Sequence, residues 1–585
     1  MSTTLDPAAK AQLREQQVRQ AEELLSTDSP ARSFAKELFH GRFAAELVLP
    51  YPKLSGEEAA RVKDALSELR AFCDEQLDPD EIDRQADIPQ PVIDGLGRLG
   101  VLGMTAPEAV GGRGFSQLAY CKILEELGSR CSATSIFVNA HHSIGIRALL
   151  LFGTDAQLER WLPDLVSGRK LAAFALTEPQ AGSDAANVQT QATPSPDGSY
   201  YTLNGEKRYI TNGAIAEVLT VMARTPVAGR DDTAVSAFLV SPDMPGFRVV
   251  EPRMEKLGIR GTATARLAFD NMRVPAENLL GSPGKGLRIA LTVLDFGRTT
   301  FGACCTGAAK TCLRLANEHA HSRVQFGQTL AEFELIQKKL ARMAACTYAM
   351  EAMTTVTAGL IDRGLDDYML ETAMLKVYST EVLWTIVNDA FQIHGGAAYF
   401  TDLPLERMLR DARINQIGEG ANEVLTSFIG LVGMRGPGEA LRTVWNTLHR
   451  PWSGVGSLGR FAGSEIRRRW ALPTIPVQSA PLKRRARELS RLIRSFSLQV
   501  ERELIRHREE ILERQLVQER IANIAMELYA STCVLSRLDA ALQTSGNVSE
   551  TSKSAELFLT QSSRRIRQLL RKCSDNDDEL IRAFE

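Results

Sequence analysis

The sequence has no apolar run of the about 20 residues that a helix needs to span a bilayer, so no transmembrane helix is predicted. Its nine cysteines include no Cys-x-x-Cys pair and no cysteine–histidine spacing suited to zinc, so we expect free thiols and no metal site. A net charge of −2 gives no reason to expect nucleic acid as a partner. Met1 to Leu25 mixes acidic with basic residues, unlike a secretory signal or a transit peptide, so we expect a cytoplasmic protein.

The length of 585 residues is too great for one hydrophobic core and suits three or four domains. Apolar residues are first spaced as in a helix, for example Val62, Leu66, Leu69 and Phe72. The spacing then shortens to that of β-strands and later becomes helical again. These changes predict a multidomain α+β protein. The predicted parts are an N-terminal extension (1–32), a helical domain (33–173) and a middle β domain (174–281). A four-helix bundle (282–440), a connector (441–481) and a second helical domain (482–585) follow.

Local signals define some of the expected elements. Asn204-Gly205 lies between Tyr200–Leu203 and Lys207–Thr211, which predicts a β-hairpin, and 234–240 and 266–269 are predicted as further strands. Thr329-Leu-Ala-Glu332 fits a helix capping box. A later helix is expected from about Leu365 to His394, ending where Gly395 suits a C-cap.

The segment Phe174-Ala-Leu-Thr-Glu-Pro-Gln-Ala-Gly-Ser-Asp184 has the composition of a loop that brings backbone close to a phosphate-bearing ligand. Taken alone, the segment fits a tight turn between a helix and a strand equally well.

Glu419 is the candidate catalytic residue. It lies in the run Gln416-Ile-Gly-Glu-Gly-Ala421, which offers few polar partners, and desolvation would raise the basicity of its carboxylate. The alternative is an exposed acid at a helix start, where the helix dipole favours negative charge.

A segment rich in tryptophan and arginine, residues 441–470, holds Trp445, Trp452 and Trp470 and the run Arg467-Arg-Arg469. Tryptophan prefers the membrane interface and arginine binds anionic headgroups, which predicts peripheral contact with the inner face of a membrane. The alternative is a connector whose tryptophans pack on the last domain.

The loop 174–184, the run Gln392-Ile-His-Gly-Gly396 and the run Glu419-Gly-Ala-Asn422 together resemble the signature regions of the acyl-CoA dehydrogenase family. The last domain resembles that of the very-long-chain branch and of a related respiratory complex I assembly factor. The resemblance implies the acyl-CoA dehydrogenase fold, FAD, an acyl-CoA substrate, a homodimer and an electron-transfer flavoprotein as acceptor.

The resemblance also implies a role for individual residues. Glu419 would be the base that removes the α-proton, with its backbone amide and a ribityl hydroxyl holding the thioester carbonyl. The implied contacts with the acyl-CoA are Ser183, Asp295, Arg298 and Gly420. The implied contacts with FAD are Phe174, Leu176, Thr177, Gly182, Ser183, Tyr209, Ile210, Thr211, Ala421 and Asn422, together with Arg323, Gln325, Phe326, Gln392, Gly395 and Gly396 at the dimer interface.

The sequence departs from the family pattern near the base. Gly418 stands where the family has an aromatic residue, Ala421 where it has threonine, and Ser135 and Asn139 stand at positions that are richer in glycine in the very-long-chain branch. We expect dehydrogenation of an acyl-CoA that is long-chain. The alternatives are an acyl-CoA oxidase and a non-catalytic assembly protein on the same fold.

Overall fold

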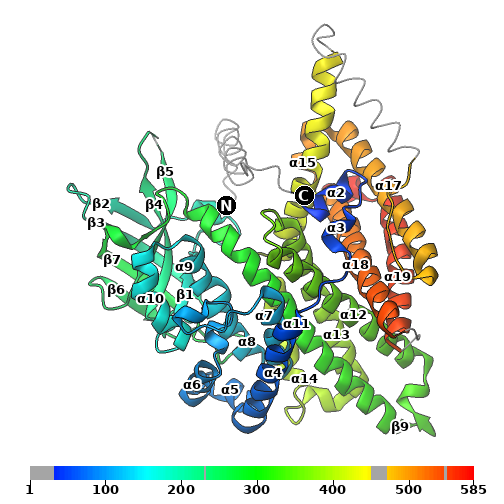
Figure 1. The fold of residues 1–585 in the computed structure, drawn as a ribbon, viewed down its shortest axis with the longest axis horizontal. Coiled ribbons are helices and arrows are strands. Elements are labelled where there is room, and N and C mark those ends of the chain that lie inside the picture. The colour runs from blue at the N-terminus through cyan, green and yellow to red at the C-terminus, as the bar shows by residue number, and fades with distance from the viewer. Residues whose placement is uncertain (1–31, 230–231, 449–470, 546–549, 585) are drawn as a thin grey trace.

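The computed structural model describes residues 32–584, apart from 230–231, 449–470 and 546–549. Figure 1 shows a β domain at one end of the molecule, a helical bundle in the middle and the C-terminal helices on the far side of that bundle. The connector that carries the predicted membrane contact falls mostly outside the described residues.

The first part of the chain is helical. Some of its helices start at residues that satisfy free amide groups: the Ser33 hydroxyl accepts from the Lys36 N–H, and the Asp78 carboxylate accepts from the Asp80 and Glu81 N–H groups. The helices are α2 (Phe34–Phe39), α3 (Ala45–Val48), α4 (Gly56–Gln76), α5 (Pro79–Gln85), α6 (Gln90–Arg98), α7 (Gln117–Arg130), α8 (Ser132–Val138), α9 (Arg147–Phe152) and α10 (Asp155–Ser167), with a π-helix at Asn139–Ile146.

One helical stretch in the described part of the chain, Ser132–Phe152, is long and apolar enough to cross a membrane, judged by length and composition alone. Within it, 67% of the most apolar window is buried inside the protein. Because its contacts are already with the protein interior, this stretch has the environment of a core helix.

The β domain is one mixed sheet of eight strands, ordered β6-β7-β3-β2-β4-β5-β8, with β1 parallel to β4. The strands are β1 (Ala172–Ala175), β2 (Gln191–Pro194), β3 (Tyr200–Ile210), β4 (Val218–Pro226), β5 (Thr233–Val240), β6 (Phe247–Glu251), β7 (Ala265–Pro275) and β8 (Leu279–Leu280). The strands expected at 234–240 and 266–269 are confirmed as parts of β5 and β7.

The predicted hairpin at Asn204-Gly205 is wrong. Residues 200–210 form the single strand β3, and its pairing with β7 shifts register between Leu203 and Gly205. A β-bulge therefore takes the place of the expected turn. Glycine is required here for space, because a Cβ at Gly205 would lie 2.5 Å from the Thr190 hydroxyl oxygen.

The bundle follows the β domain. The capping box is confirmed, since the Thr329 N–H donates to the Glu332 carboxylate over 2.7 Å just before α12. The expected end at Gly395 is also confirmed, with φ of 62° at that residue. The elements are α11 (Gly286–Ser322), β9 (Val324–Gln325), β10 (Gln328–Thr329), α12 (Glu334–Asp362), α13 (Met369–His394), α14 (Leu405–Arg413) and α15 (Asn422–Leu448).

The helix α15 continues past residue 440, where we placed the end of the bundle domain. Pro437 lies inside this helix, and the sequence from Glu439 to Leu448 contains neither glycine nor proline to end it. The last domain then consists of α17 (Lys483–His507), α18 (Gln515–Ser545), α19 (Glu550–Lys572) and α20 (Asp578–Arg582).

The C-terminal domain shares one hydrophobic core with the bundle and with α2. The Phe39 ring meets the Phe496 ring edge-on at 5.0 Å, and the Thr357 and Tyr529 hydroxyls are 2.8 Å apart. Burial of such large side chains contributes ~2–3 kcal/mol each, so the C-terminal helices are an integral layer of the molecule.

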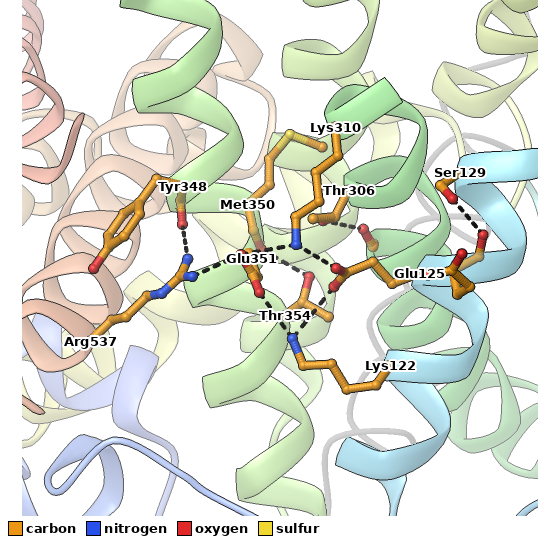
Figure 2. Close-up of polar contacts among 12 residues, drawn as sticks. Lys122, Glu125, Ser129, Thr306, Lys310, Tyr348, Met350, Glu351, Thr354 and Arg537 are labelled. Carbon is orange, nitrogen blue, oxygen red and sulfur yellow. Dashed lines mark hydrogen bonds and ion pairs between the residues drawn. The ribbon is translucent and has the colours of Figure 1, made fainter. Parts of the chain in front are cut away.

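An ionic cluster joins four helices at the edge of this core (Figure 2). The Glu351 carboxylate on α12 lies 3.0 Å from the Lys122 ammonium on α7, 3.1 Å from that of Lys310 on α11 and 2.8 Å from the Arg537 guanidinium on α18. Burial opposes ionisation of Glu351, but the three cations outweigh it and hold its pKa well below the usual value.

We predict that Glu351→Gln destabilises the protein by about 2–3 kcal/mol, because Lys122 and Lys310 would then share only Glu125 and Arg537 would have no carboxylate partner within the cluster. The depressed pKa means that this stabilisation is present above about pH 4.3, the unfolded value, and is lost as pH falls through the native pKa. Urea unfolding at pH 7 measures the change.

The matched control is Glu318→Gln, which breaks an exposed ion pair with Arg314 within α11. Exposed pairs contribute less than about 1 kcal/mol. Equal losses in the two variants would contradict a structural role for the Glu351 cluster.

Candidate active site

A cavity of about 2180 Å³ lies between the β domain, α11, the start of α15 and the segment 504–512 of the C-terminal domain. It brings together residues that are far apart in sequence. The predicted site residues that line it are Phe174, Leu176, Thr177, Gly182, Ser183, Tyr209, Ile210, Thr211, Asp295, Arg298, Glu419, Gly420 and Ala421.

The loop 174–183 forms one wall of this cavity and is anchored from beneath by a buried ion pair. The Lys207 ammonium on β3 donates to the Glu178 carboxylate over 2.6 Å and to the Leu176 carbonyl over 3.0 Å. The same carboxylate accepts the backbone N–H groups of Gln189 and Thr190. The loop therefore keeps its shape through side chains that the sequence pattern did not single out.

Burial lowers the pKa of Lys207 to about 8, against the opposing effect of Glu178. Burial also disfavours the charged form of Glu178, but Lys207 and the hydrogen bonds outweigh it and lower the pKa of that carboxyl. Each charge thus depends on the other for its stability inside the domain.

The end of β3 forms the adjacent part of the wall. Ile210 is buried, whereas Tyr209 is 58% exposed, has φ of 62° and has the Arg208 guanidinium 4.8 Å from its ring centroid. Together with Phe174 and Leu176, these residues give a broad and largely apolar surface beside an anchored loop. Such a surface fits a flat aromatic ring system whose polar extension lies along loop backbone, as in FAD.

Glu419 lines the same cavity and lies in a strained turn. Its φ is 58° and that of Gly420 is 97°, so two successive residues adopt left-handed conformations before α15 begins at Asn422. A residue other than glycine rarely adopts this conformation, and such strain is found preferentially at functional sites. The turn brings the Glu419 side chain to the cavity beside Gly297 of α11, where a Cβ would lie 3.3 Å from Oε2.

The Glu419 carboxylate is removed from solvent. Its Oε2 atom is buried and has no hydrogen-bond partner in the described part of the chain. Burial raises the pKa of Glu419, while Arg298 and Lys376 oppose that rise. This environment agrees with the desolvated carboxylate expected from the sequence.

Asp295 and Arg298 lie buried on α11 behind the base. The Arg298 guanidinium donates to Asp295 over 3.0 Å and to the Glu419 backbone carbonyl over 3.3 Å, and the Thr372 hydroxyl donates to Asp295 over 2.8 Å. Within this chain the pair supports the turn that carries Glu419. Asn422, another predicted contact, is buried behind the cavity and does not line it.

A second set of predicted residues lies away from the cavity. Arg323, Gln325 and Phe326 lie at or beside the β9–β10 hairpin, which Figure 1 shows at the end of the bundle remote from the β domain. Its Phe326-Gly327 turn has φ of 53° and 81°, and Phe326 is 96% exposed. This turn cannot reach the cavity of its own chain, so any flavin contact by these residues would have to be made across a dimer interface.

The remaining members of this set, Gln392, Gly395 and Gly396, are exposed at the end of α13. The end of α13 lies against the end of α11, because the His394 and His319 rings stack at 4.3 Å. Both ends therefore belong to one exposed surface. The His394 Nδ1–H donates to the Ala390 carbonyl over 2.8 Å. In the described residues no group of three or more metal-ligating side chains gathers.

Two buried lysines beside the cavity were not identified from the sequence. Lys207 and Lys376 are fully buried, whereas lysine within a strand or helix pattern is normally taken as exposed. Lys207 stands directly before the Arg208-Tyr-Ile-Thr211 motif, which was the one available signal. Lys376 lies in the apolar run of α13 and has no motif beside it.

The family models that match this chain correspond to the domains described above. The chain matches the N-terminal, middle and C-terminal domain models of acyl-CoA dehydrogenases at residues 60–169, 173–272 and 284–433. Residues 480–583 match the ACAD9/ACADV C-terminal domain.

Similar individual proteins are known as well. The chain is 37% identical to the mitochondrial very long-chain specific acyl-CoA dehydrogenase of Bos taurus over 88% of this chain and 80% of the bovine protein. An acyl-CoA dehydrogenase from Bacillus anthracis complexed with FAD superposes with a TM-score of 0.76 at 30% identity, covering 92% of this chain and 90% of that one. Butyryl-CoA dehydrogenase from Megasphaera elsdenii superposes with a TM-score of 0.61 at 36% identity, over 65% and 99% of the two chains.

We predict that Lys207→Met weakens FAD retention, because the unpaired Glu178 would no longer hold the loop 174–183. The ratio of flavin to protein absorbance after gel filtration should fall at least several-fold. The control Glu206→Gln alters the neighbouring residue of β3, which pairs with Arg266 at the surface, and should leave that ratio unchanged. Normal flavin content in dilute Lys207→Met protein would show that the loop does not need this anchor.

Proposed function

Because the chain belongs to the acyl-CoA dehydrogenase family, we propose that this FAD-dependent enzyme acts on long-chain acyl-CoA and passes its electrons to an electron-transfer flavoprotein. The observation that carries the proposed mechanism is the buried Oε2 of Glu419, which has no hydrogen-bond partner within the described ranges of the chain and lies in a cavity shared with the loop 174–183. The likeness to the bovine very-long-chain protein and the size of the cavity support a long acyl chain.

In the proposed mechanism Glu419 removes the proton from the α-carbon of the thioester. Its carboxylate can do so because burial raises its basicity and leaves one oxygen without a hydrogen bond. FAD, when bound, supplies the acceptor for the hydride that leaves the β-carbon. The loop 174–183 and the end of β3 would hold it, and the apolar lining would exclude water from the reacting carbons.

The dimer and the location belong to the same proposal. We propose a homodimer in which Arg323, Gln325, Phe326, Gln392, Gly395 and Gly396 of each subunit meet the cofactor of the other. The exposed Phe326 and the adjoining ends of α11 and α13 support this arrangement.

We also propose a cytoplasmic protein that contacts a membrane peripherally. The support for the membrane contact comes from the composition of residues 441–470 alone. We predict that the protein sediments with vesicles containing anionic lipid and that replacing Arg467, Arg468 and Arg469 by glutamine reduces this binding at low salt. A wild-type protein that ignores such vesicles would identify the segment as a connector only.

The functional proposal predicts that acyl-CoAs of graded length reduce the bound flavin, with the highest kcat/KM at long chains. Electron-transfer flavoprotein should support turnover, whereas oxygen alone should not. Stopped-flow absorbance and an oxygen electrode distinguish these cases. Rapid oxygen consumption without another acceptor would favour an acyl-CoA oxidase, and a protein that binds FAD without being reduced would favour an assembly protein.

The variant Glu419→Gln is the matched control, since the amide has nearly the same shape but cannot accept the α-proton. It should keep FAD and lose at least ~10²–10⁴-fold in the rate of flavin reduction. Because the carboxylate is the active form and its pKa is raised, wild-type activity should fall as pH decreases through that pKa. Normal reduction in the variant would place the base elsewhere.

A further inference from the structure

Lys376 is a fully buried lysine on α13, directly behind the turn that carries the candidate base. Its ammonium donates to the Gly420 carbonyl over 2.7 Å and to the Asn422 side-chain oxygen over 2.8 Å. Both acceptors are neutral. A buried ammonium without a directly bonded carboxylate is costly, so its retention here calls for a specific explanation.

The two acceptors tie Lys376 to the geometry of the turn. Arg298 donates to the carbonyl of Glu419, and Lys376 donates to the carbonyl of the next residue, Gly420. Two buried cations, from α11 and α13, therefore hold two successive carbonyls of a backbone segment in which both residues have positive φ. Asn422 extends the support, because its amide nitrogen donates to the Thr380 hydroxyl and to the Glu381 carboxylate.

Arg298 and Lys376 stabilise the negative charge of the Glu419 carboxylate without forming a hydrogen bond to its Oε2 atom. They favour the ionised form of Glu419, but their hydrogen bonds go to backbone and to other side chains, so Oε2 stays free of hydrogen bonds. The other titratable groups that face Lys376 are Glu381 on its own helix and Cys305 and Arg298 on α11. Burial raises the pKa of the Cys305 thiol, which leaves Glu419 and Glu381 as the facing anions.

We propose that Lys376 is a positioning residue for catalysis, which holds the Glu419–Gly420 turn in its strained conformation and keeps the Glu419 carboxylate ionised. The inference rests on the proposed function of Glu419 as the base. It assigns to α13 a direct part in the acid–base chemistry, in addition to packing within the bundle.

Two substitutions separate charge from hydrogen bonding. Lys376→Arg keeps the positive charge, and Lys376→Gln keeps a hydrogen-bond donor but removes the charge. The rate of flavin reduction by acyl-CoA is measured from pH 5 to 10 in each, with flavin absorbance and thermal unfolding as checks on folding. Lys63→Gln, at an exposed position of α4, serves as the control.

We expect both variants at Lys376 to lose about tenfold or more in maximal rate, because a small displacement of the base is costly. In Lys376→Gln the acid limb of the profile should also move up by about 1 pH unit, because an opposite charge near the carboxylate has been lost. In Lys376→Arg and Lys63→Gln that limb should stay at the wild-type pH. A purely structural role would change the rate without moving the limb, and an unmoved limb in Lys376→Gln would overturn the proposal.

A measurement on the wild-type protein covers the case in which neither variant folds. Burial lowers the pKa of Lys376 to about 8, against the effects of the facing anions. Loss of its charge above that pH should loosen the turn and reduce the rate, whereas a flat profile to pH 10 would contradict the inference. If wild-type protein is not reduced by any acyl-CoA, the proposed function itself has failed, which is a different result from an active enzyme that does not need Lys376.

Discussion

The arrangement of the site depends on one constraint: the carboxylate of Glu419 is an ionisable group in a largely apolar cavity. Removing such a group from water costs several kcal/mol unless charge or hydrogen bonds compensate it. Direct pairing with a cation would repay that cost but would also occupy the lone pairs that a base needs. Here the cations Arg298 and Lys376 bind the backbone around Glu419, so they stabilise its charge while Oε2 has no hydrogen-bond partner among the residues that the structure describes.

The arrangement of Arg298, Lys376 and Glu419 requires elements from distant parts of the chain to be held rigidly together. One cation comes from α11, the other from α13, and the base from the turn before α15, while the facing wall comes from the β domain. The shared core of bundle and C-terminal helices fixes the helical side. The Glu351 cluster ties α7 and α18 to the same bundle (Figure 2). The C-terminal domain therefore belongs to the framework of the site, and its segment 504–512 lines the cavity itself.

Much of this arrangement could be predicted from local sequence signals, and the failures have physical causes. The capping box at Thr329 and the C-cap at Gly395 depend on residues close in sequence, so their outcome was predictable. The hairpin predicted at Asn204-Gly205 was wrong because the same dipeptide also suits a β-bulge. Whether a turn or a bulge forms depends on the close approach of Thr190, which lies just before β2. The roles of Lys207 and Lys376 were missed because only tertiary contacts reveal that a lysine is buried and what it binds.

Two of the departures from the family pattern, Gly418 and Ala421, can be interpreted in the same terms. A Cβ at Gly418 would meet only the Ile414 carbonyl oxygen, at 3.7 Å, so the backbone there does not require glycine and the missing aromatic side chain leaves open space beside the base. Ala421 likewise lacks a hydroxyl, and the electrostatic effects of Arg298 and Lys376 on Glu419 are present beside it. Both changes alter the shape and polarity of the cavity wall but leave intact the groups that position and ionise the carboxylate. They therefore bear on which acyl group fits, and the proposed base keeps the groups that support it.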